Sequence, residues 1–220
     1  MYRSWSEQLP PEVEVCPIQL PGRENRLLEA PFTDLFSLIN ALGPIVQELL
    51  DKPYAFFGHS MGAIISFELA RFLRQANRQG PVHLYVSGHR APHLPDPGAP
   101  TYHLPEAEFI KELVRLNGTP QEVLQNAELL QLLIPLLRAD FAISETYQYI
   151  EDAPLACKIT ALGSTQDSEV SIEELQGWSR QTTNAFQQHI FPGDHFYIHT
   201  REQALLQFLS SRLVEDALSV

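Results

Sequence analysis

Short, mostly apolar segments alternate along the chain with longer segments in which apolar residues recur every three or four positions. The short segments predict β-strands, and the longer ones predict amphipathic helices with one buried face. We expect strands over residues 13–20, 54–60, 82–88, 158–164 and 187–193. We expect helices over residues 32–50, 61–77, 171–182 and 200–214. This alternation predicts an α/β fold, with a mainly parallel sheet that helices cover on both faces.

Two of these segments carry further expectations about burial. The strand over residues 54–60 (YAFFGHS) is nearly all apolar, which is typical of a central strand buried on both faces. Thr33 or Asp34 is expected to cap the helix over residues 32–50. The expected buried face of that helix consists of Leu35, Leu38, Ile39, Leu42, Ile45, Val46 and Leu49.

Residues 95–150 interrupt the alternation with three helical patterns and no convincing strand, over residues 106–118, 120–130 and 132–150. Ligands of parallel α/β sheets bind beyond the carboxyl ends of the strands, so we interpret the insertion as a helical lid over that edge. Its apolar residues either line an acyl pocket or simply pack together, and packing is the default. The candidates are Phe109, Leu113, Leu132, Leu136 and Phe141.

The composition favours one domain and argues against several kinds of partner. With 220 residues and 44% hydrophobic content, the chain is long enough for one well-buried core. Its net charge of -12 argues against nucleic acid, and its apolar runs are too short to span a membrane. The N-terminus lacks the apolar core of a signal peptide. Cys16 and Cys157 stand far apart and outside any metal-binding spacing, which fits a reducing cytoplasm better than a disulfide framework.

One motif in this framework carries chemistry. Residues 58–62 (GHSMG) match the pattern G-x-S-x-G, between a predicted buried strand and a predicted helix. That context is typical of the nucleophile elbow of the α/β-hydrolase fold, in which a sharp strand-to-helix turn exposes a reactive serine. The sequence therefore predicts Ser60 as a nucleophile.

A serine nucleophile needs a general base and a carboxylate that orients the base. In this fold the order along the chain is Ser, then Asp or Glu, then His. Asp167 follows the predicted strand 158–164 and His195 follows the predicted strand 187–193, so both belong at the same edge of the sheet as Ser60. Asp194 competes for the acidic role, but adjacent residues rarely orient each other's side chains, so Asp167 is favoured. His59 is expected to be structural or part of the pocket wall.

Together these residues resemble the type II thioesterases that serve polyketide and nonribosomal peptide synthetases. The resemblance runs nearly end to end, through QLPGRENRL (19–27), FFGHSMGAIISFELAR (56–71), VSGHRAP (86–92), LIPLLRADFAISETYQY (133–149) and FPGDHFYI (191–198). It implies a single α/β-hydrolase domain over residues 1–220, with the lid at about 95–150. It also implies Ser60, Asp167 and His195 as a catalytic triad that needs no metal or organic cofactor.

The resemblance further implies an oxyanion hole, to which the backbone N–H of Met61 contributes one donor. In the family, the second donor belongs to an upstream loop of the type F-P-x-A-G-G, and the printed sequence begins after that point. Loss of one such donor costs about 3 kcal/mol of transition-state stabilisation. Either the true start lies upstream or the protein is short and impaired, and the intact downstream motifs favour the first explanation.

The activity implied by the resemblance is hydrolysis of aberrant or stalled acyl thioesters from the phosphopantetheine arm of carrier domains. Because carrier domains are usually acidic, docking would require a local basic patch on this acidic protein. Candidates for such a patch are Arg23, Arg26, Arg71, Arg74 and Arg90. By the same resemblance, Arg138 and Asp140 are expected to anchor the lid to the core by charge pairing.

Two other functions remain open at this point. One is a stand-alone fatty-acyl thioesterase or carboxylesterase of the same fold, because a Ser-His-Asp triad alone does not exclude it. The other is a truncated homologue that binds carrier domains and turns over slowly.

Overall fold

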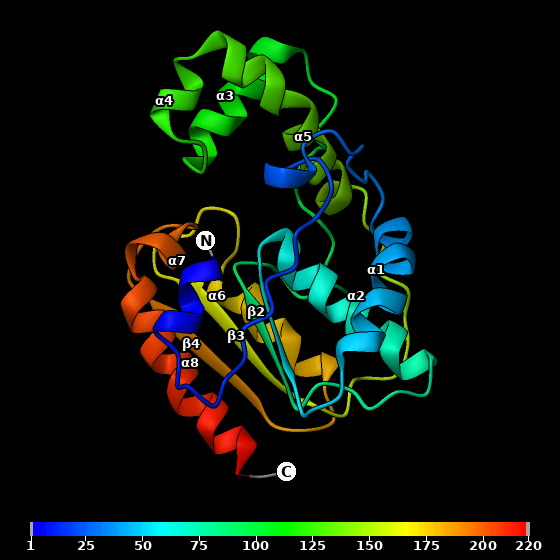
Figure 1. Cartoon of the computed structure of the whole chain (residues 1–220). Coiled ribbons are helices and arrows are strands. Elements are labelled where there is room, and N and C mark those ends of the chain that lie inside the picture. The colour runs from blue at the N-terminus through cyan, green and yellow to red at the C-terminus, as the bar shows by residue number, and fades with distance from the viewer. Residues whose placement is uncertain (1, 219–220) are drawn as a thin grey trace. The chain divides into compact units, whose positions relative to one another are not determined.

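The computed structural model of the chain describes residues 2–218 (Figure 1). The chain folds into two compact units. Of the described residues, 2–18, 42–91 and 152–218 form the sheet unit, and 19–41 and 92–151 form the helical unit. The expectation of a single domain over residues 1–220 stays a prediction. None of the described helices is both long enough and apolar enough to span a membrane.

The sheet unit is built on four parallel strands in the order β1-β2-β3-β4. These strands are β1 (Ala55–His59), β2 (His83–Ser87), β3 (Lys158–Ser164) and β4 (Phe186–Phe191). The helices of this unit are α2 (Met61–Gln75), α6 (Ile172–Gln176), α7 (Tyr197–Thr200) and α8 (Glu202–Ala217). Helix α8 lies on one face of the sheet and α2 on the other (Figure 1). The predicted parallel α/β architecture is therefore confirmed.

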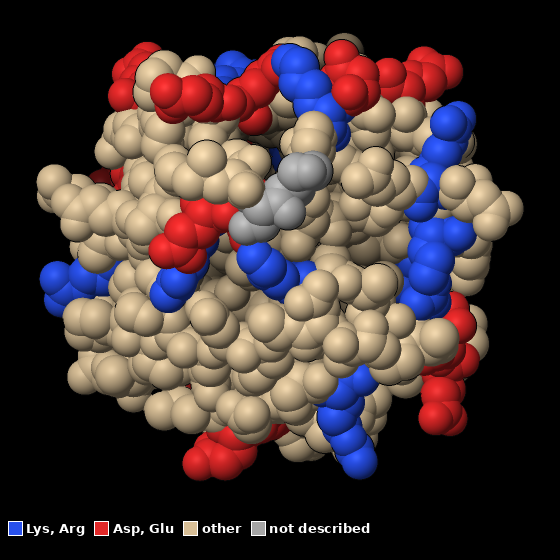
Figure 2. Space-filling view, turned by 90° about the horizontal axis from the view of Figure 1, so that it is seen from below, with Lys and Arg blue, Asp and Glu red and all other residues tan. Residues whose placement is uncertain are grey.

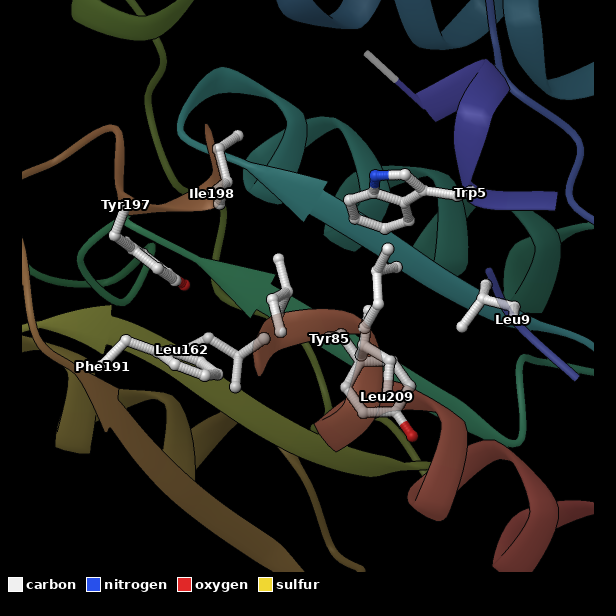
Figure 3. Close-up of a cluster of buried hydrophobic side chains, with 10 residues drawn as sticks. Trp5, Leu9, Tyr85, Leu162, Phe191, Tyr197, Ile198 and Leu209 are labelled. Carbon is white, nitrogen blue, oxygen red and sulfur yellow. The ribbon is translucent and has the colours of Figure 1, made fainter. Parts of the chain in front are cut away.

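The face of the sheet under α8 carries a continuous apolar cluster (Figure 3). Tyr85 of β2 and Leu162 of β3 pack there with Leu209 of α8, and all three are nearly fully buried. The 3-10 helix η1 (Tyr2–Glu7) adds Trp5, whose ring centroid lies 5.0 Å from that of Phe57 in β1. These contacts hold the N-terminal segment against β1 and α8.

The sequence located most of these elements closely. Strand β3 matches its predicted range, and β1, β2, β4 and α2 lie within two residues of theirs. The predicted helix over residues 171–182 is divided into α6 and the 3-10 helix η3 (Gly177–Gln181). The predicted helix over residues 200–214 begins early with the single turn α7 and continues as α8.

The strand predicted over residues 13–20 is wrong, and so is the central position expected for β1. Residues 13–20 form no strand in the structure, although Val13 and Val15 pack against the apolar cluster. Apolar alternation places side chains on a core, but a strand also needs a neighbouring strand to complete its ladder. Among the described residues the sheet ends at β1, so β1 is a half-buried edge strand.

Helix α1 (Leu35–Leu49) confirms the predicted helix, although it begins three residues after the predicted start at residue 32, and it confirms one of the two candidate caps. Asp34 Oδ1 accepts a hydrogen bond from the Ser37 backbone N–H at 2.7 Å. The predicted buried face is wrong at two positions, since Ile45 is 61% and Leu49 is 65% exposed. Periodicity fixes where a side chain points around the helix axis, but it does not fix how far the covering surface extends along that axis.

The helical unit contains α3 (Glu106–Leu116), α4 (Gln121–Leu124) and α5 (Ala127–Glu145), together with the 3-10 helix η2 (Glu24–Arg26). The first predicted helix of the insertion is confirmed as α3. The second predicted helix, over residues 120–130, is confirmed only as the single turn α4. A new helix begins after Asn126, which is the N-cap of α5. Its side-chain oxygen accepts hydrogen bonds from the backbone N–H groups of Glu128 and Leu129, both at 3.1 Å.

Packing inside the helical unit accounts for several residues of the insertion. Phe109 is fully buried and meets Phe141 with ring centroids 5.2 Å apart. Arg138 lies over the Phe109 ring at 4.4 Å and donates to the carbonyl oxygen of Tyr102. Asp140 accepts two hydrogen bonds from Arg23, at 2.7 and 3.2 Å. The polar contacts of these two residues thus join parts of the helical unit to one another.

Candidate active site

Ser60 lies at the strand-to-helix junction between β1 and α2, with a backbone φ of 53°. A positive φ is strained for any residue other than glycine, so the surroundings must hold it in place. The Ser60 N–H donates to the carbonyl oxygen of Ser87 at 2.7 Å, and the Ser60 carbonyl oxygen accepts from the Ala63 N–H at 2.9 Å. The sharp turn predicted from the G-x-S-x-G pattern is therefore present.

The two glycines of the turn differ sharply in their surroundings, which gives a testable prediction. A Cβ atom at Gly58 would overlap the backbone carbonyl of Gly62, whereas one at Gly62 would have no described heavy atom within 4 Å. We expect Gly58→Ala to lower the free energy of unfolding by about 3 kcal/mol or more, because the elbow backbone must move. Gly62 lies in α2, where alanine favours the helix more than glycine does. Gly62→Ala should therefore leave the free energy of unfolding unchanged or raise it slightly. Urea unfolding of both variants checks this, and equal stabilities would contradict it.

Asp167 and His195 come together at the carboxyl ends of β3 and β4. His195 Nδ1 lies 2.9 Å from Asp167 Oδ2 and 3.1 Å from Asp167 Oδ1. The Asp167 side chain is only 1% exposed, and its Oδ1 also accepts from the Glu169 backbone N–H at 2.8 Å. Asp194, the competing acid, instead accepts a hydrogen bond from the backbone N–H of Phe196 at 3.0 Å. Asp167 is therefore the carboxylate within hydrogen-bond distance of His195, which agrees with the placement predicted from the sequence.

The His195 ring also contacts a surface that the sequence did not predict as part of the site. Gly88 follows β2 with a φ of 58°, and a Cβ atom there would lie 3.2 Å from His195 Cε1 and 2.8 Å from His59 Cε1. The rings of His59 and His195 have centroids 5.0 Å apart. Because His59 directly precedes Ser60, this contact brings His195 close to the turn that carries Ser60. Gly88, the last residue of the strand predicted over residues 82–88, was the available signal.

Burial sets the charge states of two side chains close to His195, which are His59 and Tyr197. Burial lowers the pKa of His59 well below its ordinary value, and the neighbouring His195 lowers it further. Burial also raises the pKa of Tyr197, although the hydrogen bond between Tyr197 and Ser87 opposes that shift. His59 is therefore a neutral imidazole, and Tyr197 is a neutral phenol.

The site lies at one edge of a parallel sheet. It consists of a nucleophile elbow and of a His–Asp pair at the ends of later strands. The thioesterase domain family matches residues 1–213 of this sequence. The chain belongs to the thioesterase family. This thioesterase has the fold and the strand-end placement of Ser60, Asp167 and His195 that its sequence predicts.

Curated relatives extend the likeness over almost the whole chain. The gramicidin S biosynthesis protein GrsT of Aneurinibacillus migulanus is 46% identical over 212 residues, which are 96% of this chain and 83% of the relative. The linear gramicidin dehydrogenase LgrE of Brevibacillus parabrevis is 49% identical over 216 residues, 97% of this chain and 82% of the relative. Dehydrogenases bind dinucleotides through a G-x-G-x-x-G turn. In this thioesterase no two glycines are separated by a single residue, so the printed sequence contains no G-x-G and hence no such turn.

A solved structure agrees with the fold. ClbQ from the colibactin NRPS/PKS pathway has a TM-score of 0.93 at 27% identity and covers 100% of this chain and 93% of its own. The resemblance predicted from the sequence motifs is thus confirmed at the level of the family and the fold.

Each of the five arginines proposed for a basic patch forms an ion pair with a carboxylate. Their ion pairs are Arg23–Asp140 at 2.7 Å, Arg26–Glu29 at 2.5 Å, Arg71–Glu68 at 2.6 Å, Arg74–Asp152 at 2.5 Å and Arg90–Glu174 at 3.5 Å. On the face seen in Figure 2, Lys and Arg side chains form separate groups with Asp and Glu side chains nearby. These arginines therefore stabilise local structure in this thioesterase.

Proposed function

We propose that this thioesterase is an editing enzyme that hydrolyses aberrant or stalled acyl groups from the phosphopantetheine arm of carrier domains. The observation that carries the proposal is the near end-to-end similarity to a gramicidin S biosynthesis protein and to Thioesterase PikA5 of Streptomyces venezuelae. The second of these is 37% identical over 96% of this chain and 75% of the relative. The partners would be acyl or peptidyl carrier domains of polyketide and nonribosomal peptide synthesis, in the cytoplasm.

In the proposed mechanism, Ser60, His195 and Asp167 form the catalytic triad. His195 Nε2 takes the proton of the Ser60 hydroxyl as Oγ attacks the thioester carbonyl, and Asp167 stabilises the imidazolium through Nδ1. The oxyanion of the tetrahedral intermediate accepts a hydrogen bond from the Met61 N–H, which opens α2 and has no intrahelical acceptor. The C–S bond then breaks, and the leaving sulfur takes the proton from His195.

Deacylation repeats this path with water as the nucleophile. His195 removes a proton from water as its oxygen attacks the acyl carbon bound to Ser60. Collapse of the second tetrahedral intermediate breaks the acyl C–O bond and returns the proton to Ser60 Oγ. The carboxylic acid leaves, and the free enzyme is restored.

A second function is favoured by a different relative. The medium-chain S-acyl fatty acid synthase thioesterase of Rattus norvegicus is 34% identical over 207 residues, 90% of this chain and 76% of the relative. By this analogy the substrate would be a medium-chain fatty-acyl thioester.

The two functions differ in the substrate that they prefer. We would compare kcat/KM for one acyl group carried on a peptidyl carrier domain and on coenzyme A, and then for short and medium acyl chains on each. The editing function predicts at least a tenfold preference for the carrier-bound form and activity on short acyl groups. A preference for medium-chain acyl coenzyme A would contradict it and support the second function.

A further inference from the structure

A line of buried hydrogen bonds connects the residues that flank the nucleophile and the base. The Tyr197 hydroxyl lies 2.7 Å from Ser87 Oγ, and Ser87 Oγ lies 2.8 Å from His59 Nδ1. Tyr197 is two residues after His195, and His59 is immediately before Ser60. Ser87 ends β2, and its carbonyl oxygen accepts the Ser60 N–H. One serine thus connects the segments that carry the two reacting side chains.

The charge states allow two arrangements of these hydrogen bonds. Tyr197 stays protonated because burial raises its pKa, and its hydroxyl either donates to Ser87 Oγ or accepts from it. In the first arrangement the Ser87 hydroxyl donates to His59 Nδ1 of the Nε2–H tautomer, and in the second His59 Nδ1–H donates to Ser87 Oγ. In both arrangements Ser87 is hydrogen-bonded to Tyr197 and to His59, and His59 Nε2 takes no part in these bonds.

The far end of this chain is unusual. His59 Nε2 is buried, and no hydrogen-bond partner is found for it among the described residues. A buried ring nitrogen without a partner carries a desolvation cost, whether it is a donor or an acceptor, so it is rarely kept for stability alone. A leucine or methionine at this position would avoid that cost. The histidine is better explained by what it contacts, which is the ring of His195 at a centroid distance of 5.0 Å.

Asp167 contacts the His195 ring at one atom, Nδ1, which lies within hydrogen-bond distance of both carboxylate oxygens. A contact at one atom does not by itself fix the tilt of the ring. The tilt is limited where the ring contacts Gly88 and His59. Tyr197 stacks on Phe191 at 5.1 Å and 18°, so its hydrogen bond to Ser87 ties the segment after His195 to the sheet.

We propose that Tyr197, Ser87 and His59 are positioning residues, whose hydrogen-bonded chain holds the His195 imidazole at reacting distance from Ser60. This inference rests on the proposed roles of Ser60 and His195. Misplacement of a reacting group by about 1 Å costs roughly a hundredfold in rate. Loss of the Tyr197–Ser87 hydrogen bond should therefore lower kcat by about 10- to 100-fold and leave KM within about twofold.

Tyr197→Phe tests the chain because it removes one hydroxyl and keeps the stacked ring. Tyr85→Phe is the matched control, since it removes another buried phenol of the sheet unit, which donates to Asp216 Oδ2 at 3.1 Å. Thermal unfolding and steady-state kinetics on a soluble acyl thioester would be measured for both. We expect similar losses of stability, with a fall in kcat for Tyr197→Phe alone. Equal kcat values in the two variants, measured well below both melting temperatures, would overturn the proposal.

A second variant keeps the test decisive if Tyr197→Phe does not fold. Ser87→Ala should show the same fall in kcat, and the double variant should be no slower than Ser87→Ala, because both changes remove one shared interaction. Additive losses would contradict a single chain.

Labelling of Ser60 by a fluorophosphonate separates this inference from the proposed function. If the wild-type chain hydrolyses no thioester but is labelled, the proposed function fails, and the labelling rates of the variants still test the positioning chain. Slower labelling of Tyr197→Phe than of Tyr85→Phe supports the chain, and equal rates overturn it.

Discussion

Replacing Ser60 with alanine is expected to abolish thioester hydrolysis, with a fall in kcat of about 10⁴-fold or more. In the proposed mechanism the acyl-enzyme forms on Ser60 Oγ, and without this atom only uncatalysed attack by bound water remains. Alanine keeps the Cβ atom, so the strained turn at φ 53° should survive with little change in stability. Single-turnover hydrolysis of an acyl thioester measures the effect.

Ser211→Ala is the control for this change, because its hydroxyl is exposed on α8 and donates only to the carbonyl oxygen of Phe208. It should leave kcat unaltered. Residual activity of Ser60→Ala within tenfold of the wild type would remove Ser60 from the mechanism.

Asp167→Asn is expected to lower kcat by about 10⁴-fold. In the proposed mechanism the carboxylate accepts a hydrogen bond from His195 Nδ1–H, which leaves Nε2 without a proton and able to act as the base. An amide group at this position would favour the opposite tautomer, in which Nε2 carries the proton and cannot accept one from Ser60. Steady-state kinetics measures the effect.

Asp194→Asn is the matched control, because Asp194 is the other acid beside His195 and its carboxylate bonds to the Phe196 N–H. It should cost less than tenfold in kcat. A larger loss in Asp194→Asn than in Asp167→Asn would reverse the assignment of the acid.

The sequence was sufficient to place Ser60, Asp167 and His195 at one edge of the sheet. A short apolar strand followed by G-x-S-x-G located Ser60, and two later strands located Asp167 and His195 at their carboxyl ends. This works because parallel strands end at a common edge, so the order of strands along the chain already limits which side chains can meet.

The supporting side chains could not be predicted in the same way. Ser87 and Tyr197 are separated by 110 positions, and their hydrogen bond depends on how β2 and α7 pack. His59 was expected to be structural or part of the pocket wall, and its contact with His195 depends on the absence of a side chain at Gly88. Such contacts arise from tertiary packing, which local periodicity does not encode.

The errors in the fold have the same origin. Residues 13–20 have the composition of a strand, but a ladder requires a partner that no local pattern specifies. The apolar pattern over residues 120–130 continued across Asn126, whose side chain ends one helix and begins the next. In both cases a hydrogen-bond requirement overrode the hydrophobic pattern.

The most direct test of the central claim is mass spectrometry of an acyl-loaded carrier domain incubated with this chain, beside the Ser60→Ala variant. The account predicts that the wild-type chain removes the mass of the acyl group and leaves the free phosphopantetheine thiol, while the variant leaves the acyl-carrier intact. Release of the acyl group at equal rates by both proteins, or by neither, would contradict the proposal that this thioesterase edits carrier-bound acyl groups through Ser60.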